Sequence, residues 1–197
     1  MALSCAVNRI PFQMKSKLLG IYSITCLLWF VNLSVYAQSK LATKTGKVVF
    51  VSNAPLEKIE ATSNALNGAM DLSSNTFAFS IEVKTFTGFN SALQQEHFFE
   101  NYMETDRFPK ATLSGQLIDP ILSTSTQQKV RAKGSLNVHG ISKERIIEVT
   151  IVKRGTGFDV SSNFNVSLSD HNIVIPKVVS QKITESIAVS IQGNMAQ

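Results

Sequence analysis

Apolar and polar residues alternate one by one over much of the chain, which is the pattern of a β-strand with one buried face. The clearest case is 158–169, where one face carries Phe158, Val160, Ser162, Phe164, Val166 and Leu168. The alternation recurs at 76–84, 130–138, 147–151 and 183–191, and weaker versions lie at 41–44, 47–52, 57–62, 65–71 and 110–118. The pattern predicts an all-β fold.

One helical pattern interrupts these strands, over 91–104. Ser91 and Gln94 have the spacing of a capping box. Two pairs of large apolar residues then recur four positions apart, Phe98/Tyr102 and Phe99/Met103. Pro109 cannot continue a helix, so a short amphipathic helix should end before it and a strand should begin near Lys110.

Turn-forming residues separate the strands at short intervals: Asn53-Ala54-Pro55, Ser63-Asn64, Ser73-Ser74-Asn75, Asp119-Pro120, His139-Gly140 and Gly155-Thr156-Gly157. Short connections join strands that are neighbours in space, which predicts an antiparallel meander. A meander of roughly eight or more strands avoids exposed edges most completely by closing into a barrel. A sandwich of two sheets is the alternative.

The first 37 residues have the form of an export signal. Three basic residues precede an apolar run from Leu18 to about Leu33, and Val35-Tyr36-Ala37 offers a cleavage site. Cleavage after Ala37 would leave one domain, 38–197. The alternative is an uncleaved anchor, because 18–35 is close to membrane-spanning length.

Composition narrows the possible chemistry. Both cysteines, Cys5 and Cys26, precede residue 38, so the predicted mature domain has no disulfide and no thiol ligand or nucleophile. Of the 19 Lys and Arg residues three precede residue 38, which leaves 16 against 14 acidic residues. This small excess gives no indication of nucleic-acid binding.

The face predicted to point inward mixes small and large side chains. Ala61, Gly68, Ala111, Gly115, Ala132, Gly134 and Ser162 are small, whereas Phe77, Phe79, Phe158 and Phe164 are large. A barrel of about eight strands can be filled by its own side chains or can hold one small ligand. The residues alone leave both possibilities open: an apolar cavity, or a core in which large and small residues interdigitate.

The segment 170–182 (DHNIVIPKVVSQK) is too apolar for an ordinary solvent loop, and Pro176 prevents one regular element. We expect it to fold over a barrel mouth together with the 91–104 helix, either as a mobile lid or as a fixed plug.

Polar candidates are few. Glu185 has the inward parity of its strand, and Lys177, Lys182 and Arg107 could meet an anionic head group, although solvated surface charge is the simpler interpretation of each. The histidines, His97, His139 and His171, lack the spacing of a zinc motif. Ser169-Asp170-His171 contains the residue types of a hydrolase, but adjacency in sequence is not triad geometry. We expect no metal, no cofactor and no enzymatic activity.

Two segments resemble a known family. FFENYMETDRFPKATLSG and GSLNVHGISKERIIEVTI are similar, in this order, to segments of the YceI-like family of periplasmic polyisoprenoid-binding proteins. The resemblance implies a lipocalin-like antiparallel barrel that sequesters a long-chain amphiphile, such as a polyisoprenoid or a fatty acid or amide, in the periplasm. Transient contact with a membrane is a further hypothesis. With the resemblance, the cavity interpretation is preferred, and the expected cavity residues are Phe77, Phe79, Phe98, Leu136, Phe158 and Phe164, with Ile173 and Val174 at the mouth. The alternative is a solid-cored barrel that serves as an interaction module of the cell envelope.

Overall fold

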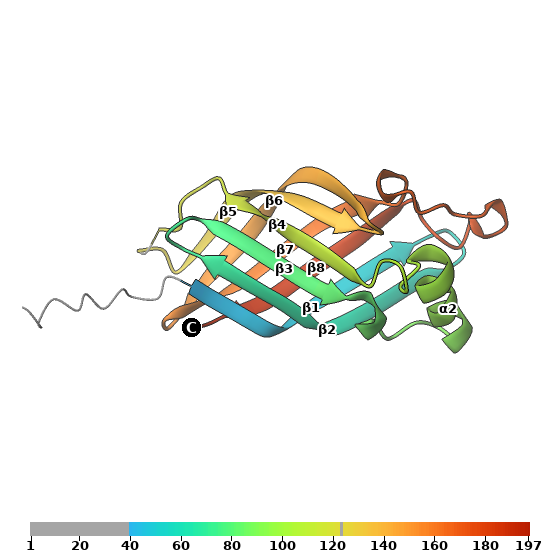
Figure 1. The fold of residues 1–197 in the computed structure, drawn as a ribbon, viewed down its shortest axis with the longest axis horizontal. Coiled ribbons are helices and arrows are strands. Elements are labelled where there is room, and N and C mark those ends of the chain that lie inside the picture. The colour runs from blue at the N-terminus through green and yellow to red at the C-terminus, as the bar shows by residue number, and fades with distance from the viewer. Residues whose placement is uncertain (1–39, 123) are drawn as a thin grey trace, which may run out of the picture. The chain divides into compact units, whose positions relative to one another are not determined.

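The structure, a computed structural model, describes residues 40–122 and 124–197, so the predicted signal at 1–37 lies outside the described residues. Eight strands form a closed barrel in which each strand pairs antiparallel with the next and the last pairs with the first (Figure 1). The barrel prediction is confirmed, and the sandwich alternative is wrong.

The strands are β1 (Lys40–Asn53), β2 (Lys58–Asp71), β3 (Thr76–Glu82), β4 (Lys110–Leu117), β5 (Gln127–Val138), β6 (Ile141–Arg154), β7 (Gly157–Ser167) and β8 (Ser186–Met195). The helical elements are the 3₁₀ turn η2 (Val83–Thr85), the α-helix α2 (Ala92–His97), the π-turn η3 (Phe98–Tyr102) and the 3₁₀ turns η4 (Ser169–His171) and η5 (Lys177–Val179). No helix among the described residues is long and apolar enough to cross a membrane.

β1 and β2 are each one long strand, where the sequence predicts two. The turn expected at Ser63-Asn64 is instead an irregularity inside β2, because the pairing changes register between Gly46↔Leu66 and Val48↔Ser63. The Ser63 hydroxyl accepts the Ala65 N–H at 3.2 Å and shares a 2.6 Å hydrogen bond with the Thr85 hydroxyl. These polar residues therefore mark a bulge, not a chain reversal.

The half of the barrel farther from α2 is filled by its own side chains, apart from a void of about 30 Å³. Its fully buried side chains include Leu41, Val130, Ile151 and Met195, and Ile121 from the β4–β5 connection packs against them. Aromatic rings cover glycines here and at the boundary with the other half, where Phe79 also reaches the cavity. A Cβ at Gly68 would lie 2.1 Å from the Phe79 ring, and one at Gly134 would lie 3.3 Å from the Phe77 ring. In this half, large and small residues interdigitate.

The β4–β5 connection is fixed by an ion pair at the closed end. The Asp119 carboxylate accepts the Arg131 backbone N–H at 2.8 Å and two guanidinium N–H groups at 3.0 and 2.8 Å. These hydrogen bonds lower the pKa of Asp119 from 3.8 to about 2. The bonds from the guanidinium contribute most, and the bond from the backbone N–H comes second.

Asp119→Asn should make the free energy of unfolding less dependent on pH in the acid range. Because the folded pKa is depressed, the carboxylate stabilises the fold fully above its ordinary pKa, and this contribution disappears as the pH falls from about 4 towards 2. Urea unfolding should find the variant less stable than the parent at pH 7, with the two converging near pH 2. A gap of constant size at both pH values would contradict this account.

Candidate functional site

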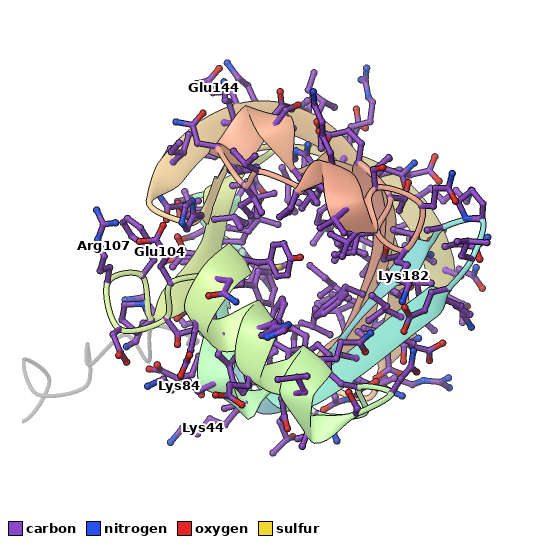
Figure 2. All side chains as sticks on the ribbon, turned by 90° about the vertical axis from the view of Figure 1, so that its right-hand side faces the viewer. Lys44, Lys84, Glu104, Arg107, Glu144 and Lys182 are labelled. Atoms are coloured by element: carbon purple, nitrogen blue, oxygen red, sulfur yellow. The ribbon has the colours of Figure 1, made fainter. Side chains whose placement is uncertain are left out.

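The half of the barrel nearer α2 is hollow. It holds a cavity of about 410 Å³ that opens at this end, which Figure 2 views directly. The strands supply an apolar wall that includes Val48, Phe50, Ile59, Leu66, Phe79, Ile81, Ala111, Leu113, Leu136, Val138, Phe164, Val166, Ile187, Val189 and Ile191. No residue of β6 belongs to this wall. The volume falls in the range of pockets that hold one small molecule.

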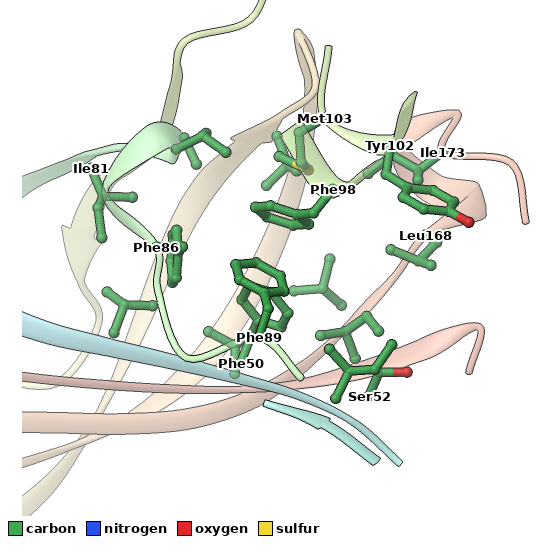
Figure 3. A pocket seen from close by; sticks show the side chains of 18 of the residues that line it. Phe50, Ser52, Ile81, Phe86, Phe89, Phe98, Tyr102, Met103, Leu168 and Ile173 are labelled. Atoms are coloured by element: carbon green, nitrogen blue, oxygen red, sulfur yellow. The ribbon is translucent and has the colours of Figure 1, made fainter. Parts of the chain in front are cut away.

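An aromatic cluster forms one side of the cavity. The Phe98 ring lies 5.1 Å from Phe50, 5.0 Å from Phe89 and 6.3 Å from Phe86, measured between centroids (Figure 3). Ring pairs at these separations attract beyond their buried area. The cluster therefore gives the cavity a defined shape.

Two polar anchors hold the 86–89 segment against the barrel. Thr87 and Thr62 exchange backbone hydrogen bonds of 2.9 and 2.8 Å, which attaches the segment to β2. Gly88 between the rings has a φ of +97°, a conformation that glycine adopts without strain. The Gln95 side chain donates to the Phe86 carbonyl at 3.0 Å and ties the segment to α2.

Phe50, Phe86 and Phe89 line the cavity but are not among the residues predicted from the sequence. The available signal was the pair of aromatic residues in Phe86-Thr87-Gly88-Phe89, a connection that had no predicted element of its own. Aromatic side chains in a connection must be buried against something, and here they line the cavity.

α2 lies at the open end because its first turn is anchored there. The Ser91 hydroxyl accepts the Gln94 N–H at 3.1 Å, which confirms the predicted cap. The Gln94 side chain accepts the Asn90 N–H and donates to Glu57 of the β1–β2 connection, at 3.0 and 2.9 Å. The chain then widens into the π-turn, in which the Met103 N–H donates to the Phe98 carbonyl at 3.0 Å.

Five of the eight predicted site residues line the cavity: Phe79, Phe98, Leu136, Phe164 and Ile173. Phe77 and Phe158 point inward but pack with the core of the closed half. Val174 is 78% exposed and does not line the cavity, whereas the preceding Ile173 packs with Val83 and Met103. Strand parity indicates which side chains point inward, but it does not indicate their depth along the barrel axis.

Arg145 closes a gap in the barrel wall. β6 pairs with β7 only over 149–154, so its first half has no ladder on that side. The Arg145 guanidinium donates to the Asn165 carbonyl at 2.9 Å and lies 5.2 Å from the centre of the Phe164 ring. This cation–π contact stabilises the position of the Phe164 ring, which forms part of the cavity wall.

The charged residues considered as contacts for a ligand head group lie at different positions relative to the cavity. Lys182 lines the mouth. Arg107 binds Glu104 and covers Phe108, outside the cavity. Glu185, for which the alternation predicts an inward position, is exposed because β8 begins only at Ser186. Hydrogen bonds from Ser169 and Ser167 lower its pKa.

Two of the histidines are structural. The buried His171 places Nδ1 3.0 Å from the Ile141 carbonyl, and burial lowers the pKa of His171, so a neutral ring donates this bond. His139 places Nε2 3.0 Å from Glu104 and Nδ1 3.1 Å from the His171 carbonyl. These bonds join the helix exit, the β5–β6 hairpin and η4. The ring of His171 is therefore engaged with backbone and not with Ser169. Within 40–122 and 124–197, no group of three His, Cys, Asp or Glu residues could hold a metal.

Tyr102 is the aromatic residue that brings a hydroxyl to the mouth. Its ring lies near Leu168 and Ile173 with the oxygen turned away from Phe98 (Figure 3), and burial raises the pKa of this phenol. The site thus combines an apolar interior with a hydrogen-bond donor at its opening. It can enclose an extended hydrocarbon chain and leave a polar end near solvent.

Comparison with known proteins agrees with this geometry. The model of the YceI-like domain matches residues 38–195. A polyisoprenoid binding domain from Saccharophagus degradans implicated in plant cell wall breakdown has a similar structure, with a TM-score of 0.67 and 12% identity over 81% of this chain and 99% of that chain. BcnA from Burkholderia cenocepacia is similar with a TM-score of 0.63 and 14% identity, over 77% of this chain and 96% of that chain. The YCEI protein of Campylobacter jejuni is similar with a TM-score of 0.55 and 14% identity, over 69% of this chain and 83% of that chain.

At these identities the structural similarity demonstrates the fold alone, and no curated protein matches the sequence. The match of the domain model covers most of the chain, including both segments on which the resemblance was based. The chain belongs to the YceI-like family.

Proposed function

We propose that this protein binds and carries a long-chain amphiphilic lipid of the polyisoprenoid or fatty-acyl type in the periplasm, without performing chemistry on it. The observation that carries the proposal is the division of the barrel into a filled half and an aromatic-walled hollow of about 410 Å³ that opens at one end. The similar domain from Saccharophagus degradans, described as polyisoprenoid binding, supports the ligand class. The export signal predicted at 1–37 supports the location.

The geometry orients the ligand. The closed end is filled by core side chains, so a chain can enter only from the α2 end with its tail first. Its head then remains at the mouth beside Tyr102 and Lys182, both of which offer hydrogen-bond donors. The mouth carboxylate of Glu57 already accepts from Asn90 and Gln94. A head group with acceptor oxygens, such as a hydroxyl, carboxylate or phosphate, complements this opening.

Organic extraction of the purified protein followed by mass spectrometry should recover close to one long-chain lipid per protein, with an oxygen-bearing head. The extracted protein should take up a fluorescent fatty-acid probe with the same stoichiometry, because the cavity has room for one chain. Protein that releases no lipid and takes up no probe would contradict the proposed function and favour the solid-cored interaction module.

A further inference from the structure

Large apolar side chains are exposed around the mouth of the cavity. Among the described residues, four such side chains belong to segments that border the opening: Leu56 at 66%, Leu93 at 59%, Val174 at 78% and Val178 at 88% exposed. Leu93 also lines the edge of the cavity, as do Glu57, Ile173 and Val179, the sequence neighbours of the other three. Single exposed apolar residues are ordinary, but a group around one opening indicates an interaction surface.

These side chains are held outward by local structure. The Val179 N–H donates to the Pro176 carbonyl at 3.0 Å, and the Val179 carbonyl accepts from Lys182 and Ile183 at 2.8 and 3.1 Å. This compact turn directs Val179 to the cavity and leaves Val178 in solvent. The Leu56 N–H donates to the Gln181 carbonyl at 3.0 Å, which joins the β1–β2 connection to the same turn. The exposure is therefore a property of the fold.

The charge of this segment favours an anionic partner. Lys177 and Lys182 flank the two valines of η5, and no acidic residue lies between His171 and Thr184. Neither lysine belongs to an ion pair found among the described residues. Aliphatic side chains beside free lysines match the boundary between lipid tails and anionic head groups. Figure 2 shows Lys182 at the margin of the open end.

We propose that the rim formed by Leu56, Leu93, Val174 and Val178 docks onto the surface of an anionic lipid bilayer, with Lys177 and Lys182 against the head groups. In this orientation the cavity mouth faces the bilayer, so a lipid chain could pass between them without crossing water. Docking depends on the exposed apolar rim and on the two lysines, and it does not require a bound ligand.

Vesicle flotation of the purified protein tests the proposal. The protein should float with vesicles of equal parts phosphatidylcholine and phosphatidylglycerol, and weakly with phosphatidylcholine alone. Val174→Ser with Val178→Ser should weaken binding to both vesicles by roughly tenfold, because apolar contact is lost. Lys177→Gln with Lys182→Gln should remove the preference for phosphatidylglycerol by a similar factor and abolish its dependence on salt.

Ile146→Ser is the matched control, because Ile146 is 63% exposed but lies on the barrel wall in β6. It should leave flotation unchanged. Uptake of the fluorescent fatty-acid probe should also be unchanged in the Val174/Val178 variant, since neither valine lines the cavity. This readout separates failure of docking from failure of ligand binding.

The proposal is wrong if the parent protein stays in the soluble fraction with both vesicles, or if Ile146→Ser weakens flotation as much as the paired valine change. It is also wrong if analytical ultracentrifugation without vesicles finds a dimer that the valine changes convert to a monomer, because the rim would then bind a second copy of the chain.

Discussion

Ala111→Phe should abolish ligand uptake while leaving the protein folded and at least as stable as the parent. Ala111 lies on β4 opposite Ile81 and faces the cavity, so the added ring would enter the space that a lipid chain needs. Filling an empty apolar space commonly stabilises a protein by about 0.5–2 kcal/mol. Loss of binding together with a gain in melting temperature is therefore the expected result, measured by probe titration and thermal unfolding.

Ala78→Phe provides the matched control. Ala78 lies on β3 with its side chain on the exposed face of the barrel, so the same ring there should leave probe uptake unchanged. If Ala111→Phe bound the probe with parental affinity, the hollow between Phe98 and Val189 would not be the ligand site. If it melted well below the parent, the space around Ala111 would be better packed than the structure indicates.

Much of the fold could be predicted because its determinants are local. Single-residue alternation identified the strands, and Pro109 marked where the chain returns to β4, whose first residue is Lys110. His139 and Gly140 have φ values of +51° and +73°, so the predicted tight turn is present. Closure into a barrel follows from the count of strands and the cost of free edges.

The site was predicted less well because depth along a barrel is not local. Phe77 and Phe79 have the same parity and lie two residues apart, yet only Phe79 reaches the cavity. The depth of each depends on the registers of β2, β3 and β4, which parity does not specify. The small inward residues Gly68 and Gly134 do not add to the cavity for a related reason. Gly68 is covered by the Phe79 ring of the neighbouring strand β3, and Gly134 is covered by the Phe77 ring of β3, which reaches across Gly115 of β4.

The 170–182 segment shows what composition can and cannot indicate. Its apolar character predicted a position at the mouth, and Ile173 and Val179 line the cavity there. Composition could not separate the residues that face inward from Val174 and Val178, because the turns η4 and η5 and not a strand alternation set their directions.

Gly115→Ala should destabilise the barrel far more than its small size suggests. A Cβ at position 115 would lie 2.1 Å from the Lys133 carbonyl oxygen and 2.5 Å from the Gly134 Cα, both of which are backbone atoms of the paired strand. The strands β4 and β5 would have to separate, which breaks their ladder. We expect a loss of about 3 kcal/mol or more, the upper end for overpacking, and a melting temperature lower by roughly 10 °C.

Alanine substitutions at two other glycines serve as comparisons for Gly115→Ala. At Gly134 the nearest atoms to an added Cβ are 3.1–3.3 Å away and include the Phe77 ring, so Gly134→Ala should cost about 1 kcal/mol. At Gly193 the nearest atom is 3.5 Å away, so Gly193→Ala should be neutral or gain a few tenths of a kcal/mol from the stiffer unfolded chain. Urea and thermal unfolding should rank the three variants in this order. Equal losses at 115 and 193 would mean that β4 and β5 do not approach as closely as the structure describes.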